Sequence, residues 1–538
     1  MKAPHLFLVV QVFAYGLFGA GSQAADPLPP RPTINVKDFG AKGDCQRVTD
    51  GAIRKGSSVL TSASAHFAAE DVGKSIYVLG ASVQKFPELG EVPGAPLGSH
   101  IAAVTDAHTI TLADAAQCDS TGAGVTWGTD DSHAIQRAID SLKTTGGTVF
   151  FPAGMYRVVY QGGPGMNVAA SNIHLQGMGN ESAIFNSTVI FHAKMKEGVL
   201  RTEQAGVPVL YVGKPGVAIE NVEVDHLWLG DNGQNYDYAV WGPHGPAVIG
   251  SAGKIDHFSF HDLTVATGFL CGVGTNSEST GFSIHHVTVL CTGEHGFYLA
   301  GTGSDGDVHD NRVLGDPKRP MRMGIAIKKK DHLRVTHNEV ANVEFQGISV
   351  VGDDPTYTSH DVLIADNWIH DLPAWHTDAI TIFNAENVII RHNRIADTSW
   401  IGINLRTSLY TVSNVVVQDN IITRAGNHDA AFGIAVHYDP PPNHPRDTPF
   451  PGSIQDITIE GNIVTDCGHG ISVARVNGHN IISGNRVECR DGALQKATIG
   501  YSIDSLPEST IDFRNNTGIN CAKYIVAPKL ANTENDLR

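Results

Sequence analysis

The sequence predicts an all-β protein: a right-handed parallel β-helix with an N-terminal capping helix and a small inserted β-subdomain. Three observations support this prediction. Alternating apolar residues around an asparagine recur along the second half of the chain, a short strand that usually opens with glycine follows each recurrence, and one amphipathic helix precedes them. Short strands that repeat about every 20 to 30 residues stack as coils of a solenoid.

The composition indicates a folded, turn-rich chain. Its 538 residues include 58 Gly and 26 Pro, and 41% are hydrophobic while 17% are charged. This glycine and proline content stays well below that of collagen-like chains. The formal net charge of -17 argues against nucleic acid as a partner, since that binding depends on Lys and Arg that neutralise phosphates.

The first 24 residues have the pattern of a signal peptide. An apolar stretch runs from Leu6 to about Ala20, and Ser22-Gln23-Ala24 supplies the small residues that precede a cleavage site. A membrane anchor is disfavoured because the stretch is short and a proline-rich segment follows it at once. We therefore expect a secreted or periplasmic protein without a membrane partner after removal of residues 1–24.

Seven cysteines lie at positions 45, 118, 271, 291, 467, 489 and 521. Export permits disulfides, and the odd count leaves at least one thiol free. Cys467, Cys489 and Cys521 follow the asparagines of successive repeats at similar offsets, so one disulfide among them is expected. No cysteine or histidine spacing has the pattern of a zinc site, and the sequence therefore predicts no metal cluster built on cysteine.

Residues 129–147 form the expected capping helix. Thr129 to Ser132 offer N-cap residues, an apolar stripe follows, and Gly146-Gly147 ends the helix. Solenoids need a cap over an open end. Before it, residues 46–128 carry strand-like patterns between Cys45 and Cys118, so we expect an inserted β-rich subdomain that this cysteine pair could clip.

The repeats begin near residue 254, and each holds an asparagine at a fixed corner. Period-2 alternation on either side of it predicts strands with one buried face. Asparagine suits such a corner because it tolerates a left-handed backbone and can bond its neighbours along the stack. The corner asparagines are Asn311, Asn338, Asn367, Asn393, Asn420, Asn462 and Asn485.

Three segments near the front resemble the opening of the pectate-lyase-like superfamily. They are Val36–Asp44, Thr129–Ile139 and Gly146–Tyr156. The resemblance implies a β-helix over residues 25–45 and 129–525, followed by a C-terminal tail, 526–538. It does not imply one reaction, because that superfamily includes lyases, hydrolases, epimerases and phage tailspikes.

Candidate catalytic residues lie on the strands that open with glycine. Residues two and four after each glycine should face outward, and stacking turns them into columns. Near the middle of the chain, Asn404 and Arg406 share a strand, with His437 and Tyr438 one repeat further on. Removal of the C5 proton of a uronate needs a base and a cation that stabilises the carboxylate. Arg406, His437 and Tyr438 could supply cation, base and acid; a solvated surface is the alternative.

Other residues on this side suit a sugar polymer. Trp faces stack on pyranose rings, while charged and polar groups orient hydroxyls or carboxylates. Seven basic residues also gather between Lys318 and Arg334, a strip that could hold an acidic glycan or only discourage edge pairing. The candidate substrate-binding residues are Lys328, Trp375, His376, Trp400, Asn404 and His469.

Acidic residues raise further possibilities: a loop that resembles part of the epimerases, a carboxyl pair for hydrolysis, and Ca²⁺ ligands. The Asp353-Asp354-Pro355 loop resembles the Asp-Pro-His-Asp region of mannuronan C5-epimerases, although Thr356 stands where that family has His. Inverting glycosidases use two carboxyls, which Asp378 with Asp353 or Asp354 could provide. Asp353 and Asp354 could also bind Ca²⁺, whose requirement the sequence leaves open.

The sequence thus predicts an enzyme that acts on a polysaccharide. The favoured reaction is β-elimination or C5 epimerisation of a uronate-containing glycan. Glycoside hydrolysis is the first alternative, and a non-catalytic glycan-binding β-helix is the second.

Overall fold

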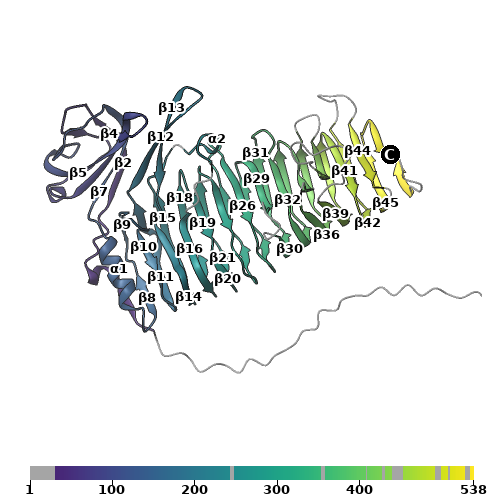
Figure 1. Cartoon of the computed structure of the whole chain (residues 1–538), viewed down its shortest axis with the longest axis horizontal. Coiled ribbons are helices and arrows are strands. Elements are labelled where there is room, and N and C mark those ends of the chain that lie inside the picture. The colour runs from purple at the N-terminus through teal and green to yellow at the C-terminus, as the bar shows by residue number, and fades with distance from the viewer. Residues whose placement is uncertain are drawn as a thin grey trace, which may run out of the picture.

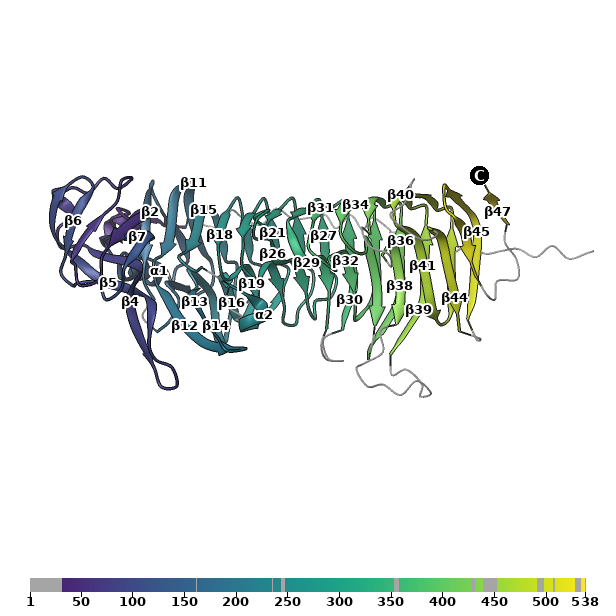
Figure 2. The same ribbon diagram turned by 90° about the horizontal axis from the view of Figure 1, so that it is seen from above.

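The computed structural model describes residues 31–160, 162–234, 236–242, 247–352, 358–407, 409–426, 431–438, 452–490, 498–506, 509–527 and 534–537. A long solenoid of stacked strands carries a small barrel at its N-terminal end (Figure 1). The view from above shows the rungs following one another along one axis toward the C-terminus (Figure 2). The predicted signal peptide, residues 1–24, lies outside the described residues. Within them, no helix is long and apolar enough to span a membrane.

The barrel is closed and is built from antiparallel neighbours. Its core holds Trp127 and Phe67, whose ring centres are 4.6 Å apart. Its strands are β2 (Gln46–Ile53), β3 (Val59–Thr61), β4 (Ser75–Phe86), β5 (Gly90–Asp106), β6 (Thr109–Leu112) and β7 (Ser120–Gly128).

One wall of the solenoid is a parallel sheet that has 14 strands among the described residues. It contains the strands that open with glycine. Its members are β10 (Met166–Val168), β14 (Leu210–Glu220), β16 (Ala247–Asp256), β19 (Cys271–Thr275), β20 (Glu278–Thr280), β23 (His295–Leu299), β26 (Met321–Ile327), β29 (Val343–Val350), β32 (Asp378–Ile382), β35 (Ile403–Thr407), β38 (Phe432–Tyr438), β41 (His469–Val476), β44 (Ile499–Ser505) and β46 (Lys523–Val526).

The other walls form a second sheet, with 25 strands in the described part of the chain, that bends at the asparagine corner. Its members are β1 (Thr33–Asn35), β8 (Gly147–Phe150), β9 (Gly154–Val158), β11 (Ile173–Asn186), β15 (Glu223–Asp231), β17 (Ser259–His261), β18 (Thr264–Thr267), β21 (Ser283–His285), β22 (Thr288–Cys291), β24 (Asp307–His309), β25 (Arg312–Leu314), β27 (Arg334–Thr336), β28 (Glu339–Ala341), β30 (Ser359–Ala365), β31 (Trp368–Leu372), β33 (Ala385–Arg391), β34 (Arg394–Thr398), β36 (Thr411–Gln418), β37 (Ile421–Ala425), β39 (Ser453–Glu460), β40 (Ile463–Cys467), β42 (His479–Ser483), β43 (Arg486–Cys489), β45 (Thr510–Ile519) and β47 (Glu534–Leu537).

Four short helical segments and one hairpin complete the described elements. The helical segments are η1 (Val36–Phe39), η2 (Ala69–Asp71), α1 (Ser132–Ser141) and α2 (Tyr238–Trp241), and the hairpin joins β12 (Val189–Lys196) to β13 (Val199–Gly206). A parallel solenoid and a small antiparallel barrel confirm the predicted fold class.

Apolar residues at alternate positions fill the interior of each rung. Ile325 and Ile327 of β26 pair with Ile348 and Val350 of β29, and all four are fully buried. Each such side chain removed from water stabilises the fold by about 1.5 to 3 kcal/mol. The period-2 pattern of the sequence therefore corresponds to one continuous core.

The corner asparagines form a buried ladder. Asn338 donates from Nδ2 to Asn367 Oδ1 (3.0 Å) and to Val308 O (2.9 Å), and its Oδ1 accepts from Asn311 Nδ2 (2.9 Å). The residue in the left-handed region is the preceding one, for example Asp310 at φ 54° or His337 at φ 56°. The prediction that asparagine adopts the left-handed backbone was therefore wrong, while the bonding along the stack is confirmed.

Helix α1 closes the N-terminal end of the interior. Its buried face, including Ile135 and Ile139, belongs to the same hydrophobic core as the rungs. Asp131, just before the helix, accepts hydrogen bonds from the backbone N–H groups of Lys42 (2.7 Å) and Gly43 (3.0 Å). These bonds join two segments that the chain separates by the whole barrel.

A disulfide joins Cys489 to Cys521 at the far end of the solenoid. This is the single disulfide expected among the three C-terminal cysteines, and Cys467 is a buried free thiol. Cys45 and Cys118 are both free thiols, so the expected clip across the barrel is not formed.

Candidate functional site

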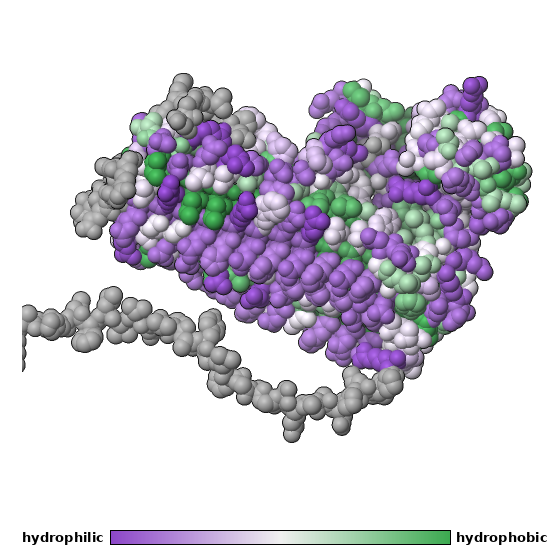
Figure 3. Space-filling view, turned by 180° about the vertical axis from the view of Figure 1, so that it is seen from behind, coloured by the Kyte–Doolittle hydropathy of each residue, from purple (hydrophilic) through white to green (hydrophobic). Residues whose placement is uncertain are grey.

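A cavity of about 440 Å³ lies on the outer face of the 14-stranded sheet. In the space-filling view the outline of the molecule is hollowed between the N-terminal region and the C-terminal rungs, and most of the visible flank is hydrophilic (Figure 3). We call the cavity on the outer face of this sheet the central cavity. Its lining residues are Tyr238, Cys271, Asn276, Glu294, His295, Tyr298, Arg322, Met323, Ala326, Lys328, Phe345, Gln346, Val351, Phe383 and Arg406.

Stacked rungs align the residues of this wall in columns. Tyr298, Ala326 and Ser349 are register partners, and the column continues through Thr381 and Asn404. The side-chain oxygens of Ser349 and Asn404 are buried without a hydrogen-bond partner among the described residues. A buried polar atom without a hydrogen bond lowers the stability of the fold. Water or sugar hydroxyls could supply the missing bonds.

Three cationic side chains line the central cavity. The Arg322 guanidinium lies 3.4 Å from the centre of the Tyr238 ring, and Lys328 Nζ lies 5.7 Å from that of Tyr298. Arg406 lies 5.6 Å from the ring of Phe383. Their concentration contrasts with the net charge of -17, and cations in one cleft attract anions despite the overall sign.

The structure places Arg406 beside His437, because the two are register partners on β35 and β38. Thr407 pairs with Tyr438 in the same way. Of this predicted trio, only Arg406 lines the central cavity. Burial raises the pKa of Tyr438, which lies at the end of its strand.

Asp378 opens the strand next to Gln346 on this wall and is 4% exposed. Its carboxylate accepts hydrogen bonds from Asn404 Nδ2 (2.8 Å) and Thr381 Oγ1 (3.2 Å). Burial raises the pKa of Asp378 to about 6, although Asn404 and the charge of Arg406 oppose the shift. Asp378 is not part of the cavity lining, and its hydrogen bond holds Asn404 in place.

The predicted aromatic residues form a stack of their own. The ring centre of His376 lies 5.0 Å from that of Trp375 and 4.2 Å from that of Trp400, with nearly parallel planes. Trp375 is 65% exposed, so its face is available to a sugar ring. His469 lies apart from this stack: its Nδ1 accepts from the N–H of Ile499 (3.1 Å).

Two other sequence expectations have different outcomes. Asp353 and Asp354 lie outside the described residues, so their carboxylates and the suggested Ca²⁺ site have no structural account. The basic strip does not form one surface. Lys330 is fully buried, donates to Ser279 Oγ (2.6 Å), and has its pKa lowered to about 8 by burial.

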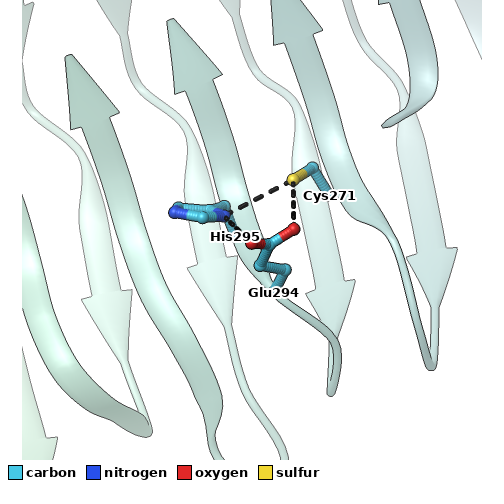
Figure 4. Close-up of side chains that lie close together, drawn as sticks. All are labelled: Cys271, Glu294 and His295. Atoms are coloured by element: carbon cyan, nitrogen blue, oxygen red, sulfur yellow. Dashed lines mark hydrogen bonds and ion pairs between the residues drawn. The ribbon is translucent and has the colours of Figure 1, made fainter. Parts of the chain in front are cut away.

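A buried cluster of Cys271, Glu294 and His295 was not among the predicted site residues. The three side chains point toward one another at the cavity wall (Figure 4). Cys271 Sγ lies 3.5 Å from His295 Nδ1 and 3.8 Å from Glu294 Oε2, and His295 Nδ1 lies 3.9 Å from Glu294 Oε1. Burial, with Arg322 and Lys328 nearby, lowers the pKa of His295 to about 3, and burial raises that of the Cys271 thiol. These donors could hold a metal ion.

A sequence signal for this cluster exists. Cys271, His295, Met323 and Gln346 each precede the glycine of their strand, and Asp378 precedes Ala379 at the equivalent place. They form a third outward column. The strands begin before the glycine, so this column lies outside the two columns that the sequence pattern predicts.

Residues 118–301 match the family described as rhamnogalacturonase A/epimerase, pectate lyase-like. Residues 302–448 match the right handed beta helix region. The chain is a pectate-lyase-like right-handed β-helix. The pectate-lyase-like resemblance and the predicted handedness are thus confirmed. The two matched regions include the rungs on which the central cavity lies.

Three of the solved structures similar to this pectate-lyase-like β-helix carry names of three different enzymes, and others are tailspikes and adhesins. The A-module of mannuronan C-5 epimerase AlgE6 from Azotobacter vinelandii is 16% identical, over 76% of this chain and 94% of that one, with a TM-score of 0.47. An exopolygalacturonase from Thermotoga maritima is 13% identical, over 73% and 88%, with a TM-score of 0.43. A GH87 α-1,3-glucanase from Streptomyces thermodiastaticus is 14% identical, over 91% and 90%, with a TM-score of 0.46. No curated protein sequence matches the chain.

Proposed function

We propose that this β-helix acts on an acidic polysaccharide by β-elimination or C5 epimerisation of a uronate unit. The observation that carries the proposal is the convergence of Arg322, Lys328 and Arg406 on one aromatic-walled cavity of an otherwise acidic protein. A neutral glycan would offer these three cations no negative charge to pair with. The family match supports a polysaccharide as the substrate class.

Both reactions start with removal of the proton at C5, next to the carboxylate. Negative charge then develops on that carboxylate, and fixed cations stabilise it. Lys328 and Arg406 occupy equivalent positions three rungs apart, or about 14 Å at the spacing of adjacent strands. They would therefore contact different sugar units of one bound chain.

Tyr298 is our candidate for the proton-transfer group. It is half-buried on the cavity wall, and its ring centre lies 5.2 Å from that of His295. A phenol can exchange a proton with the sugar when it is held within hydrogen-bond reach of C5. The earlier candidate base, His437, does not line the cavity.

Hydrolysis has weaker support. It needs a pair of carboxyls on either side of the scissile bond. Among the described residues that line the cavity, Glu294 is the one carboxylate, and Asp378 is buried outside the lining with its carboxylate hydrogen-bonded to Asn404. The alternative is therefore retained as an outcome of the test.

The test incubates purified protein with uronate-containing and neutral polysaccharides. It follows the ultraviolet absorbance of unsaturated uronates, the release of reducing ends, and C5 proton exchange by NMR in deuterated water. Lys328→Gln, Arg406→Gln and Tyr298→Phe are compared with wild type, and Arg394→Gln, a cation on β34 of the other sheet, is the matched control.

Absorbance or exchange that is confined to uronate polymers and lost in Tyr298→Phe would support the proposal. Lys328→Gln and Arg406→Gln should weaken substrate binding, because each removes a charge-assisted contact of about 1.5 to 3 kcal/mol. Reducing ends without absorbance would assign hydrolysis. Binding without absorbance, reducing ends or exchange would leave a glycan-binding protein.

We also propose that the protein works outside the cytoplasm, because residues 1–24 have the pattern of an export signal. N-terminal sequencing of the protein from its native host should then start at Ala25. A retained Met1 would contradict export by this signal.

A further inference from the structure

We propose that Cys271, Glu294 and His295 form a binding site for a zinc-like divalent metal whose open coordination position faces the central cavity. The three residues come from two adjacent rungs: Cys271 opens β19, His295 opens β23, and Glu294 directly precedes β23. All three are buried, at 2%, 3% and 6% exposure. The proposal does not depend on which reaction the cavity supports.

The donor separations suit one tetrahedral ion. Zinc bonds of about 2.3 Å to sulfur and about 2.0 to 2.1 Å to nitrogen and oxygen place neighbouring donors about 3.3 to 3.6 Å apart. The observed separations are 3.5 Å for sulfur and nitrogen, 3.8 Å for sulfur and oxygen, and 3.9 Å for nitrogen and oxygen. Side-chain adjustments of up to about half an ångström would bring all three into bonding range.

The charges also match a divalent ion. A thiolate and a carboxylate carry two negative charges, which balance the ion when the imidazole is neutral. Arg322 and Lys328 line the same cavity. Metal binding displaces the thiol proton, so the affinity should rise with pH.

Three protein ligands and one open position are typical of catalytic rather than structural zinc sites. Because Cys271, Glu294 and His295 all line the cavity, the ion has a path of entry. Its fourth position would take water or an oxygen of a bound sugar. A hydrogen bond from the Cys271 thiol to His295 Nδ1 is the alternative account of the 3.5 Å separation.

A second group of potential donors lies on the other sheet. His174 Nε2 lies 3.0 Å from Asp225 Oδ2, and His261 Nε2 lies 2.9 Å from Glu223 Oε1. The donors of this second group are histidines and carboxylates only, and they lie away from the central cavity, whereas the cavity cluster adds a thiol and lines a space that can admit a ligand. We therefore favour the cavity cluster.

The experiment measures metal in the full-length mature protein by elemental analysis after dialysis against Zn²⁺ and removal of the excess. Reconstitution with Co²⁺ adds a spectroscopic readout, since a thiolate ligand gives a ligand-to-metal absorption band in the near ultraviolet. The variants are Cys271→Ser and His295→Gln. Cys291→Ser, a buried thiol outside the cluster, is the matched control, and Glu294→Gln replaces Cys271→Ser if that variant fails to fold.

We expect about one Zn²⁺ per chain in wild type and Cys291→Ser. Cys271→Ser and His295→Gln should weaken binding by more than about 100-fold, because loss of an outer-shell partner alone costs 10 to 100-fold. The cobalt–thiolate band should vanish in Cys271→Ser. Absence of bound metal, a Cys271–Cys291 disulfide, or binding that survives Cys271→Ser and is lost in His174→Gln would each overturn the assignment.

Discussion

At the scale of single residues, a buried carboxyl beside the cavity residue Gln346 couples protonation to stability. Asp378 accepts hydrogen bonds from Asn404 and Thr381 and is almost fully buried. Burial raises its pKa to about 6. Between pH about 4 and about 6, the native protein therefore keeps a proton on this carboxyl that the unfolded chain has released. Asp378 therefore makes stability depend on pH in a defined window.

The free energy of unfolding of wild type minus that of Asp378→Asn should decrease as the pH rises from about 4 to about 6. In this window the native state binds more protons than the unfolded state, which gives a negative slope. The shift from 3.8 to about 6 corresponds to a change of up to about 3 kcal/mol. Urea unfolding at several pH values measures it, and equal slopes in the two proteins would contradict the prediction.

The sequence located some of these residues and missed others for a physical reason. Asn404 and Arg406 follow from period-2 alternation after a glycine, because alternation fixes which side chains face outward. Cys271 and His295 are 24 residues apart, and only the stacking of rungs brings them together. A search for close cysteine and histidine spacings does not detect such a pair.

At the scale of elements, the asparagine ladder joins neighbouring rungs. Asn393 donates from Nδ2 to Ile364 O (2.9 Å) and Asn420 Oδ1 (3.0 Å), and its Oδ1 accepts from the backbone N and Nδ2 of Asn367. All these groups lie away from water. The ladder therefore fixes the register of the strands on either side of the corner.

Asn393→Ala should lower the free energy of unfolding by about 3 to 5 kcal/mol, because it leaves buried donors of Asn367 and an acceptor of Ile364 without partners. The control is Asn477→Ala, since Asn477 is a partly exposed residue outside the ladder, and we expect a change within about 0.5 kcal/mol. Chemical denaturation of both variants provides the comparison. Equal effects would show that the ladder adds nothing specific.

The elements themselves were largely predictable. Gly and Asn mark the start and the corner of each rung, so the repeats from residue 254 onward could be aligned by eye. The residue at which each of these strands begins was not predictable, because polar residues such as Gln346 and Asp378 belong to the strands. Pairing with the neighbouring rung makes them strand residues, and this contact is not local.

At the scale of the whole molecule, each rung contacts its neighbours and the interior is one core. Helix α1 covers the N-terminal end, and the disulfide Cys489–Cys521 ties the last rungs. Stability of such an array depends on its ends as well as on its repeats. The C-terminal rungs therefore gain most from the cross-link.

Replacing both cysteines with serine should destabilise the C-terminal rungs by about 3 to 4 kcal/mol. The bridge spans 32 residues, and the chain-entropy relation for a loop of this length gives that value. Hydrogen exchange should show faster opening of β43–β45 than of β24–β26, while Cys118→Ser, a thiol of the barrel region, should leave both unchanged. Uniform opening of all rungs would contradict an end-specific role.

The stacking of equivalent rungs means that the length of the cavity wall changes in discrete steps. One repeat of the ladder spans 27 residues between Asn393 and Asn420, and it advances the wall by about 4.8 Å. Deleting or duplicating one whole repeat between Lys328 and Arg406 would keep every strand paired, yet it would change the distance between these two charges by that step. Under the proposed function, the number of repeats between these two charges would set the spacing of the carboxylates that one bound chain presents to them.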